Sequence, residues 1–473
     1  MPCPTATDSR HFIVFSPGLV GCSNRTHRFH SAQTAMPFAQ LRNPVVRRVS
    51  INVAALGVER LARLVVALLV TAAVGRHLGV DQFGLYNAIF SLCTLFAVSS
   101  DLGISRVVVR DLVSGHDNPG TLLGTAIAMR LGSSLILCGV TVAAVAISYR
   151  SQGSEPLILG MLFGMGYVFR ASDAIDLGFQ AVTQGQVPAL ARMISLGIGA
   201  GIQLWLIRRG SGMQAFAWAF AIEGFLMALS LAWVWWRFGP PEFRRWRFEF
   251  GTGFRVLRES WPMFVAFLYT QVYYRLDTIL LEKMRGGTEA GIYSASAKFY
   301  DILIGVMPLI GVSLFPTLAR WYKDDREGFS RLYTQLTRWI TWLGLFGVVV
   351  LYLLRDQVVD LIFGQEYAEA ARVLPWHLAS AAIMFNAIFR AAYLTLAHRQ
   401  IILLWTSLIG AVVNVGLNLL LIPRLGAEGS AMAGFVTQLV ALHLTNGLFK
   451  ETRWLFRVSL QTFLPFGTPA RCS

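Results

Sequence analysis

The sequence predicts an all-α integral membrane protein built from about twelve transmembrane helices, and two observations support this fold class. First, 55% of the 473 residues are hydrophobic and only 14% are charged, whereas a soluble chain of this length carries roughly 25% charged residues. Second, the apolar residues form long unbroken runs, such as residues 64–74. A transmembrane β-barrel would instead have roughly ten-residue stretches of alternating polarity. Most of the protein surface is therefore predicted to face lipid.

Twelve apolar runs are long enough to cross a bilayer. A hydrocarbon core of roughly 30 Å requires about 20 residues of helix. Every backbone N–H and C=O group inside lipid must be paired within the protein, so each run is predicted to be helical. The runs lie at residues 50–74, 83–104, 120–148, 156–180, 187–207, 213–236, 259–281, 290–317, 334–354, 373–397, 401–422 and 428–449.

The formal net charge of +15 raises the alternative of a nucleic-acid-binding protein. The basic residues, however, lie in short loops between the apolar runs, where they are the usual orientation signal of a membrane protein. With the N-terminus inside the cell, the cytoplasmic flanks hold twenty Arg and Lys residues and the outer flanks hold nine. We therefore predict that both termini are cytoplasmic and that nucleic acid is not a partner.

The longest basic loop divides the twelve runs into six and six. We predict an N-terminal cytoplasmic tail at residues 1–48, a six-helix bundle at 49–236, a basic linker at 237–258, a second six-helix bundle at 259–450 and a cytoplasmic tail at 451–473. Met36 opens the stretch that leads into the first apolar run. Our hypothesis is that translation begins at Met36 and that residues 1–35 are not translated.

The linker alternates arginines with aromatic residues, among them Trp246, Phe248 and Phe250. This composition suits a segment that lies on a membrane surface rich in anionic lipids, because arginine binds the headgroups and the aromatic rings enter the interface. A solvated linker is the alternative interpretation.

The two halves share a short sequence pattern. Gly79-x4-Gly84-x-Tyr86 opens the second run, and Gly286-x4-Gly291-x-Tyr293 opens the eighth at a separation of 207 residues. The identical placement before equivalent helices indicates an internal duplication. Because each repeat has an even number of helices, the repeats are predicted to run parallel about an axis along the membrane normal.

Several motifs resemble a known transporter family. The first half contains His77-Leu-Gly-Val-Asp-Gln-Phe-Gly-Leu-Tyr-Asn87 and Asp101-Leu-Gly-Ile-Ser105. The second contains Trp261-Pro-Met263, Arg275-Leu-Asp277, Gly291-Ile-Tyr-Ser-Ala-Ser-Ala-Lys298 and Leu425-Gly-Ala-Glu-Gly-Ser-Ala431. Over roughly residues 45–450 the chain resembles the Wzx-type polysaccharide biosynthesis flippases. These belong to the multidrug/oligosaccharidyl-lipid/polysaccharide exporter superfamily.

The resemblance implies a MATE-like fold, with two six-helix bundles around a central cavity that opens alternately to each side. It also implies a function in the bacterial inner membrane. Such flippases move an undecaprenyl-pyrophosphate-linked oligosaccharide from the inner to the outer leaflet, for O-antigen, capsule or exopolysaccharide, and a polysaccharide polymerase is an implied partner. The alternative within the superfamily is a multidrug/cation antiporter. The lipid II flippase has two further C-terminal helices, for which this sequence has no room.

Many ionisable residues lie within the apolar runs, although each costs roughly 2.5–3.5 kcal/mol on insertion scales. They are Glu59, Arg60, Arg63, Arg130, Arg170, Asp173, Asp176, Arg192, Glu223, Arg275, Asp277, Lys298, Asp301 and Arg390. A hydrated cavity that binds an anionic headgroup would explain them, since the arginine fork makes paired bonds to phosphate oxygens. Structural ion pairs between helices are the alternative, and three pairs are available at helical spacing. These are Arg63 with Glu59, Arg170 with Asp173, and Lys298 with Asp301.

We predict that the substrate-binding residues are Arg60, Arg63, Arg130, Arg170, Arg275, Lys298 and Arg390. Arg130, Arg275 and Arg390 are the favoured members, because none has an acidic residue at helical spacing. The predicted sites of coupling to a proton or sodium gradient are Glu59, Asp173, Asp176, Glu223 and Asp277. Asp176 and Glu223 lack a basic neighbour at helical spacing within lipid. Asn414 and Asn418 share one helix face and are predicted to form hydrogen bonds between helices.

An enzyme is disfavoured. The loops between the runs are about twenty residues at most and mostly basic, which leaves no room for an aqueous catalytic domain. Five of the eight histidines (His77, His116, His377, His398 and His443) are dispersed along the chain without metal-ligand spacing, and no phosphate-binding loop of the form GxxxxGK[ST] occurs. We therefore predict no cofactor beyond an ion gradient.

Overall fold

The computed structural model describes residues 44–115, 118–243 and 245–463. The contacts divide the chain between Arg47 and Arg48, and Arg48–Ser473 is one compact unit, the second of two. Both predicted six-helix bundles lie within the second unit. The predicted start at Met36, most of the predicted N-terminal tail and the last ten residues of the predicted C-terminal tail lie outside the described residues.

The first half of the chain forms seven helices. They are α1 (Pro44–Ala97), α2 (Ile104–Ser114), α3 (Pro119–Ser148), α4 (Glu155–Arg170), α5 (Asp176–Ala181), α6 (Gln186–Arg208) and α7 (Met213–Phe238). The second half continues with α8 (Phe250–Arg285), α9 (Gly287–Gly305), α10 (Met307–Asp324), α11 (Arg326–Leu353), α12 (Arg355–Phe363), α13 (Ala370–Asn386), α14 (Arg390–Leu396), α15 (Ile401–Leu442) and α16 (Arg453–Thr462).

Two of these helices are double. The backbone reverses inside α1 at Gly79 (φ 74°, ψ 167°) and inside α15 at Gly426 (φ 57°, ψ −133°). Gly286, between α8 and α9, has nearly the same conformation as Gly79 (φ 92°, ψ 179°). Positive φ favours glycine, so the repeated pattern has a shared structural purpose. In each half, its first glycine makes the turn between two membrane helices.

The fold class is confirmed. Seven helices are long and apolar enough to cross a membrane by length and composition, and an eighth segment, from α9 to α10, is bent by 46°. The seven helices and the bent segment give eight spans, and the second limb of α15 is a ninth. The two limbs of α1 and the more charged α8 bring the number to the twelve that were expected. No strand occurs in the described part of the chain.

Four predicted runs are interrupted. The run 83–104 leaves its helix after Ala97, where Leu102 and Gly103 turn the chain into α2, and 156–180, 290–317 and 373–397 divide into α4/α5, α9/α10 and α13/α14.

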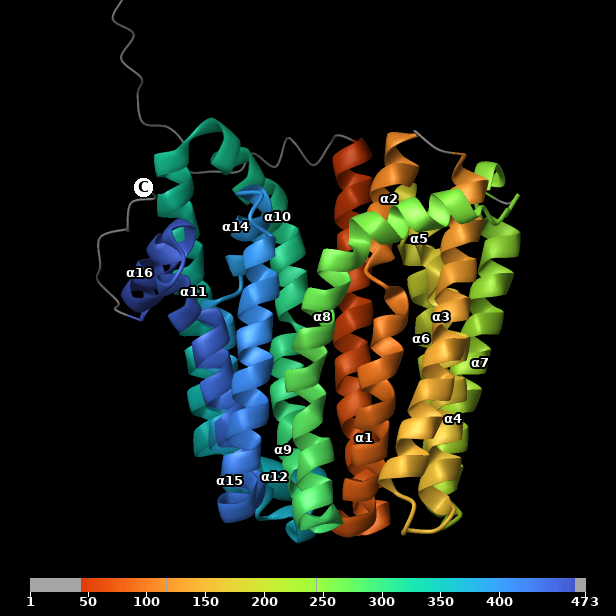
Figure 1. Cartoon of the computed structure of the whole chain (residues 1–473), viewed down its shortest axis with the longest axis vertical. Helices are drawn as coiled ribbons and strands as arrows, with labels where there is room; N and C mark the ends of the chain where they lie inside the picture. Colours follow the sequence, from red (N-terminus) through yellow and green to blue (C-terminus); the bar gives the residue numbers. More distant parts are fainter. Residues whose placement is uncertain (1–43, 116–117, 244, 464–473) are drawn as a thin grey trace, which may run out of the picture. The chain divides into compact units, whose positions relative to one another are not determined.

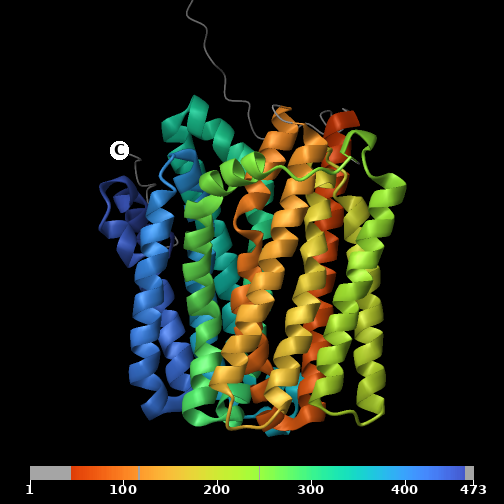
Figure 2. The ribbon, with the colours of Figure 1, turned by 45° about the vertical axis from the view of Figure 1, so that its right-hand side comes forward.

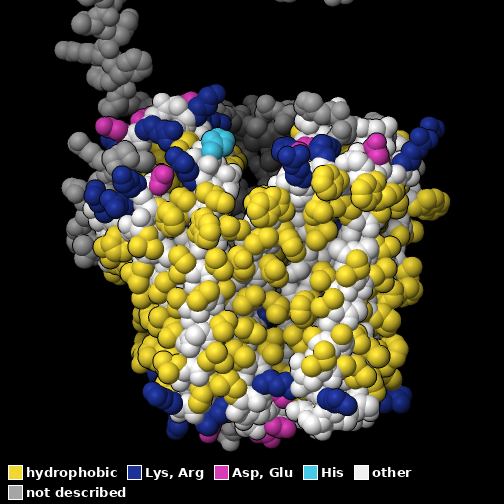
Figure 3. All heavy atoms as spheres, viewed as in Figure 1, with side chains coloured by type: hydrophobic (Ala, Val, Ile, Leu, Met, Phe, Trp, Pro, Cys, Tyr) yellow, Lys and Arg dark blue, Asp and Glu magenta, His cyan; other side chains and the backbone are white. Residues whose placement is uncertain are grey.

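A broad apolar band covers the middle of one face of the unit Arg48–Ser473. Figure 3 shows hydrophobic side chains over the middle of this face and Lys and Arg side chains gathered at its two rims. Large apolar residues such as Ile136, Ile147 and Leu343 are well exposed. A soluble protein would bury such residues, so this band is the lipid-facing surface. The protein is a multi-span membrane protein.

Within this unit, two groups of helices stand side by side (Figures 1 and 2). The N-terminal bundle contains α1 to α7, and the C-terminal bundle contains α9 to α15 together with most of α8. We call the end that carries α2 and the start of α8 the basic end, and the opposite end, with the turns at Gly79, Gly286 and Gly426, the far end.

Helix α8 connects the bundles. Its first turns lie across α2 and α3 of the N-terminal bundle, and its remaining length packs against α15 and α9 of the C-terminal bundle. At the basic end, Asp111 on α2 accepts a hydrogen bond of 2.8 Å from Arg255 Nη1 on α8 and a second from Arg110. Burial would raise the pKa of Asp111, but the hydrogen bonds from Arg255 and Arg110 outweigh it and hold that pKa below its ordinary value. The carboxylate is therefore charged when it ties α8 to the N-terminal bundle.

The segment between α7 and α8 lies against α3. The backbone of Arg247 and Glu249 forms hydrogen bonds with Thr125 and Gly120. A β-carbon on Gly124 would lie 2.7 Å from the backbone of Arg247, so glycine permits this close approach. The described part of this segment is thus a strap on α3, on which Phe248 and Phe250 are well exposed while Phe243 is buried.

Candidate functional site

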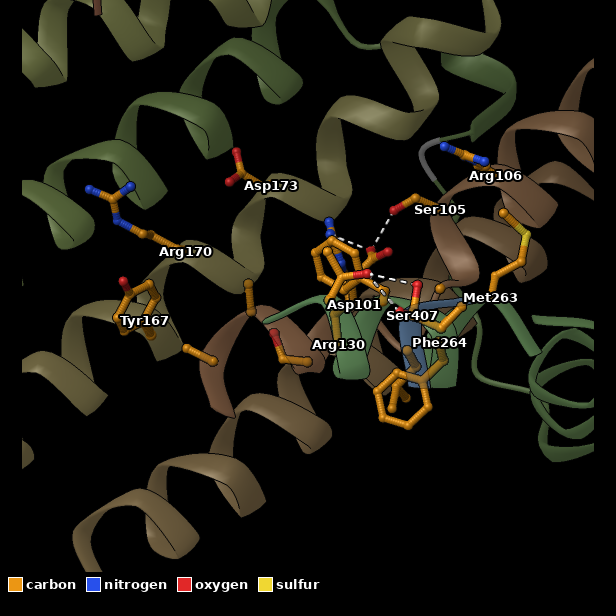
Figure 4. A pocket seen from close by; sticks show the side chains of 18 of the residues that line it. Asp101, Ser105, Arg106, Arg130, Tyr167, Arg170, Asp173, Met263, Phe264 and Ser407 are labelled. Atoms are coloured by element: carbon orange, nitrogen blue, oxygen red, sulfur yellow. Dashed lines mark hydrogen bonds and ion pairs between the residues drawn. The ribbon is translucent and has the colours of Figure 1, made fainter. Parts of the chain in front are cut away.

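A cavity of about 660 Å³ lies between the two bundles. The N-terminal bundle contributes polar and charged side chains from the end of α1, α2, α3 and α4. The C-terminal bundle contributes mostly apolar and hydroxyl side chains from α8 and α15. The lining includes Asp101, Ser105, Arg106, Arg130, Tyr167, Arg170, Asp173, Met263, Phe264, Phe267, Thr270 and Ser407, most of which are labelled in Figure 4. One wall is therefore charged and the other carries aromatic rings and hydroxyl groups.

Two further hollows share residues with this cavity. One of about 320 Å³ is lined by Arg130 and Asp173 of the first cavity and also by Arg60, Arg63 and Arg192. The other, of about 260 Å³, shares Arg170 with the first cavity and Arg63 and Arg192 with the second hollow, and it is also lined by Glu223 and Lys298. We call these three neighbouring spaces together the arginine cavity.

Arg63 and Arg170 illustrate how far helical spacing predicts partners. Arg63 pairs with Glu59 one turn earlier, as predicted. The predicted pair of Arg170 with Asp173 does not form. Arg170 reaches across to α7, where its Nη2 lies 2.8 Å from Glu223 Oε1. Helix α4 ends at Arg170 and the chain continues as a 3-10 segment, Ala171–Ile175, and the carboxylate of Asp173 lies instead 3.7 Å from Arg192 on α6.

Arg192 on α6 is the hub of the carboxylates. Its guanidinium lies 3.0 Å from Asp176, 3.7 Å from Asp173 and 3.9 Å from Glu59. Arg192 was not among the predicted site residues, although a lone arginine in an apolar run was a usable signal. Asp176 and Glu223 were predicted to lack basic neighbours on their own helices. In the structure each pairs with an arginine from another helix, Asp176 with Arg192 and Glu223 with Arg170.

Arg130 on α3, which has no acidic neighbour at helical spacing, pairs with Asp101 from the segment that follows α1. Asp101 also accepts a hydrogen bond from Ser105, and Figure 4 shows these groups meeting at the cavity wall. Arg60 and Arg106 line the arginine cavity without a carboxylate partner among the residues the structure describes. Arg106 and Asp101 were missed by the sequence prediction as site residues.

The remaining predicted cations belong to the C-terminal bundle. Lys298 lies 3.8 Å from Asp301, as predicted, and it lines both the arginine cavity and a narrow crevice of about 60 Å³. Arg275 also lines this crevice and has no carboxylate partner within residues 44–115, 118–243 and 245–463. Arg390 lies elsewhere. It is only 5% exposed and donates hydrogen bonds to Asn446 and Thr406 inside the C-terminal bundle, away from the spaces above.

Asp277 lies at the crevice in a different environment. Its side chain accepts hydrogen bonds from Tyr293 Oη (2.9 Å) and Asn418 Nδ2 (2.8 Å), so the predicted bond between helices is confirmed for Asn418. The hydroxyl of Thr437 is buried without a hydrogen-bond partner in the described residues. Asp277 itself is 3% exposed. Unlike the carboxylates of the arginine cavity, it receives its hydrogen bonds from a neutral hydroxyl and a neutral amide.

Comparisons with known proteins agree with this architecture. The family model described as "Polysaccharide biosynthesis protein" matches residues 73–372. The chain belongs to this family. Among similar proteins, a probable low-salt glycan biosynthesis flippase of Haloferax volcanii is 23% identical, with 76% of this chain and 74% of the relative aligned. The lipid III flippase of Escherichia coli is 22% identical over 82% of this chain and 95% of its own length.

Solved structures confirm the MATE-like fold. The lipid II flippase MurJ in an inward closed conformation matches 87% of this chain and 93% of its own, with a TM-score of 0.68 at 13% identity. A multidrug resistance MATE family transporter in an inward-facing conformation matches 87% of this chain and its own full length, with a TM-score of 0.62 at 15% identity. At such identities the likeness concerns the fold alone.

Proposed function

We propose that this protein flips an undecaprenyl-pyrophosphate-linked oligosaccharide from the inner to the outer leaflet of the bacterial plasma membrane by alternating access. The arginine cavity is the observation that carries this proposal. Lining a membrane cavity with so many cations is costly, and a doubly phosphorylated substrate would use them. The relatives named as glycan and lipid III flippases support the same substrate class.

The paired arginines suit phosphate well. An arginine has five N–H donors, and a carboxylate partner occupies only some of them. Arg170 Nε, for example, is buried without a hydrogen-bond partner in the described chain. Asp101 and Glu223 hold the guanidinium groups of Arg130 and Arg170 in place, which reduces the entropy lost when a pyrophosphate binds. We propose that these two arginines, with Arg60, Arg63, Arg275 and Lys298, contact the headgroup.

The opposite wall suits the sugars. Phe264 and Phe267 offer faces on which sugar rings stack, and Thr270 and Ser407 offer hydroxyl groups, which lie 3.3 Å from one another. A multidrug/cation antiporter of the same fold is the alternative function. The density of arginines disfavours it, because a cationic substrate would be repelled from this cavity.

The basic end is proposed to face the cytoplasm, following the excess of Arg and Lys in its loops. Both termini would then be cytoplasmic. The exposed aromatic residues and arginines of the strap between α7 and α8 would contact anionic lipids of the inner leaflet. The flipped glycan, destined for O-antigen, capsule or exopolysaccharide, would pass to a polysaccharide polymerase.

Asp277 is our candidate for coupling to an ion gradient. The other predicted carboxylates, Glu59, Asp173, Asp176 and Glu223, all lie within 4 Å of an arginine, which already balances their charge. Asp277 has only neutral hydrogen-bond donors, and its neighbours Asn418 and Tyr293 have oxygens suited to a sodium ion. A proton bound to Asp277 would likewise neutralise the negative charge of its carboxylate.

A transport assay tests the substrate. Purified protein in proteoliposomes is given a fluorescent polyprenyl-pyrophosphate oligosaccharide, and the fraction reaching the opposite leaflet is measured by quenching. Arg170→Gln is expected to slow flipping roughly ten- to a hundredfold, because a charge-assisted hydrogen bond contributes about 1.5–3 kcal/mol. Arg208→Gln, on the exposed end of α6, is the control and should flip normally. Cation export without glycan flipping would favour the antiporter instead.

The coupling site is tested in the same vesicles. Flipping by the unaltered protein is expected to accelerate under an imposed sodium or proton gradient, and Asp277→Asn is expected to abolish this acceleration. Equal acceleration in Asp277→Asn and the unaltered protein would remove Asp277 from the mechanism.

A further inference from the structure

The two copies of the repeated glycine pattern, one from each half of the chain, contact one another at the far end. Gly84 of the first repeat and Gly287 and Gly291 of the second approach so closely that their backbones touch. A β-carbon on Gly84 would overlap the carbonyl oxygen of Gly287 and lie 2.7 Å from the amide nitrogen of Gly291. A β-carbon on Gly287 would lie 2.5 Å from the carbonyl oxygen of Asp81, and one on Gly291 would overlap that of Val80. Real β-carbons do not make such contacts, so this junction requires glycine.

Polar bonds surround the glycine junction and also join the two bundles. Thr288 Oγ1 lies 3.3 Å from Asp81 Oδ1. Tyr149 Oη donates to Glu282 Oε2 at 2.9 Å, and Lys283 Nζ donates to the Ser148 carbonyl at 2.7 Å. Further around, the Tyr367 hydroxyl donates to the carbonyl oxygen of Gly75 at 2.9 Å, and Arg76 donates to backbone carbonyls at the end of α12.

The junction lies at the end of the molecule opposite the widest part of the arginine cavity. Between the two lies the narrow crevice, lined on the N-terminal side by Asn87, Phe90 and Ser91. Phe90 and Asn87 line the arginine cavity as well. The cavity nearer the basic end thus has a volume of about 660 Å³, whereas the crevice nearer the glycine junction has a volume of about 60 Å³.

We infer that Gly84, Gly287 and Gly291 form the seal that closes the far side of the cavity during transport. This inference rests on the proposed flipping function, because alternating access requires the far side to close and to open again. Backbone-to-backbone contact suits a reversible seal. It excludes solvent without interlocking side chains, whose separation would expose apolar surface at about 25 cal/mol per Å².

Adding one methyl group should prevent closure. In Gly84→Ala the new β-carbon meets backbone atoms, which cannot swing aside as a flexible side chain would. The altered protein would therefore occupy the far-side-open state. Two other helical glycines supply matched controls. Gly57→Ala, on the same helix, and Gly416→Ala, on α15, each place a β-carbon with no heavy atom within 4 Å.

The test uses a reporter cysteine in the crevice. Ser91→Cys is introduced after the five natural cysteines are replaced by serine, and inside-out and right-side-out vesicles are treated with a membrane-impermeant maleimide. We expect Gly84→Ala and Gly291→Ala to raise the rate of labelling from the far side at least tenfold. The two control glycine variants should label like the parent. Unchanged far-side labelling in both Gly84→Ala and Gly291→Ala would overturn the inference.

A cross-link provides a second test that does not depend on the folding of the glycine variants. In Asp81→Cys/Thr288→Cys, oxidation should tie the junction shut, stop flipping, and be reversed by a reductant. A cross-linked protein that still flips at the parent rate would overturn the seal. Labelling needs no substrate. If labelling behaves as expected and the unaltered protein moves no glycan, the seal stands and the proposed substrate is wrong.

Discussion

Replacing Arg192 should have the largest effect on stability of any single change in the arginine cavity. Its guanidinium serves three carboxylates, and its side chain is only 12% exposed. In Arg192→Met, Glu59 keeps Arg63 as a partner, but Asp176 retains only the amide of Gln180, at 3.0 Å. Removing one partner of a buried ion pair costs roughly 3–5 kcal/mol. Because Gln180 still donates to Asp176, we expect about 3 kcal/mol.

The assay is reversible unfolding in mixed detergent micelles, followed by circular dichroism or tryptophan fluorescence. The double variant Arg192→Met/Asp176→Leu removes the more buried of the two carboxylates that lose Arg192, the other being the partly exposed Asp173, and should recover most of the loss, since well-packed apolar replacements of buried pairs are often neutral. Arg208→Met, exposed on the same helix, should change the free energy of unfolding by less than about 0.5 kcal/mol. If Arg192→Met is as stable as this control, or the double variant is no more stable than Arg192→Met, the hub interpretation is wrong.

Three further outcomes follow. Arg390→Gln should reduce the folded yield, because the hydrogen bonds of Arg390 to Asn446 and Thr406 lie inside the C-terminal bundle. The purified variant should bind polyprenyl-pyrophosphate sugar with unchanged affinity, which a binding titration checks. Arg170→Lys should flip more slowly than the unaltered protein although the charge is kept, since lysine lacks the planar fork; initial flipping rates test it. Asp111→Asn should destabilise the protein by roughly 1 kcal/mol at neutral pH. The lowered pKa of Asp111 means that its stabilisation exists above the ordinary pKa of 3.8 and is lost as the pH falls through the lowered value, so the unfolding curves of the variant and the parent should converge in strong acid.

The sequence determined the fold class and the positions of the spans. Lipid forces each apolar run to satisfy its own backbone hydrogen bonds, so a local pattern is enough to find a helix. The same locality explains the pairs that were correctly predicted. Arg63 with Glu59 and Lys298 with Asp301 lie within one turn of one helix, where spacing alone brings side chains together.

The tertiary structure decided which charges face the cavity. Arg130 and Arg390 look alike in the sequence, each a lone arginine in an apolar run, yet one pairs with Asp101 at the cavity wall and the other is enclosed by amide and hydroxyl groups. The orientation of a helix about its own axis depends on packing against neighbours distant in the chain. For that reason the partners of Arg170 and Arg192, and the meeting of the two glycine repeats at the far end, appear only when the helices are assembled.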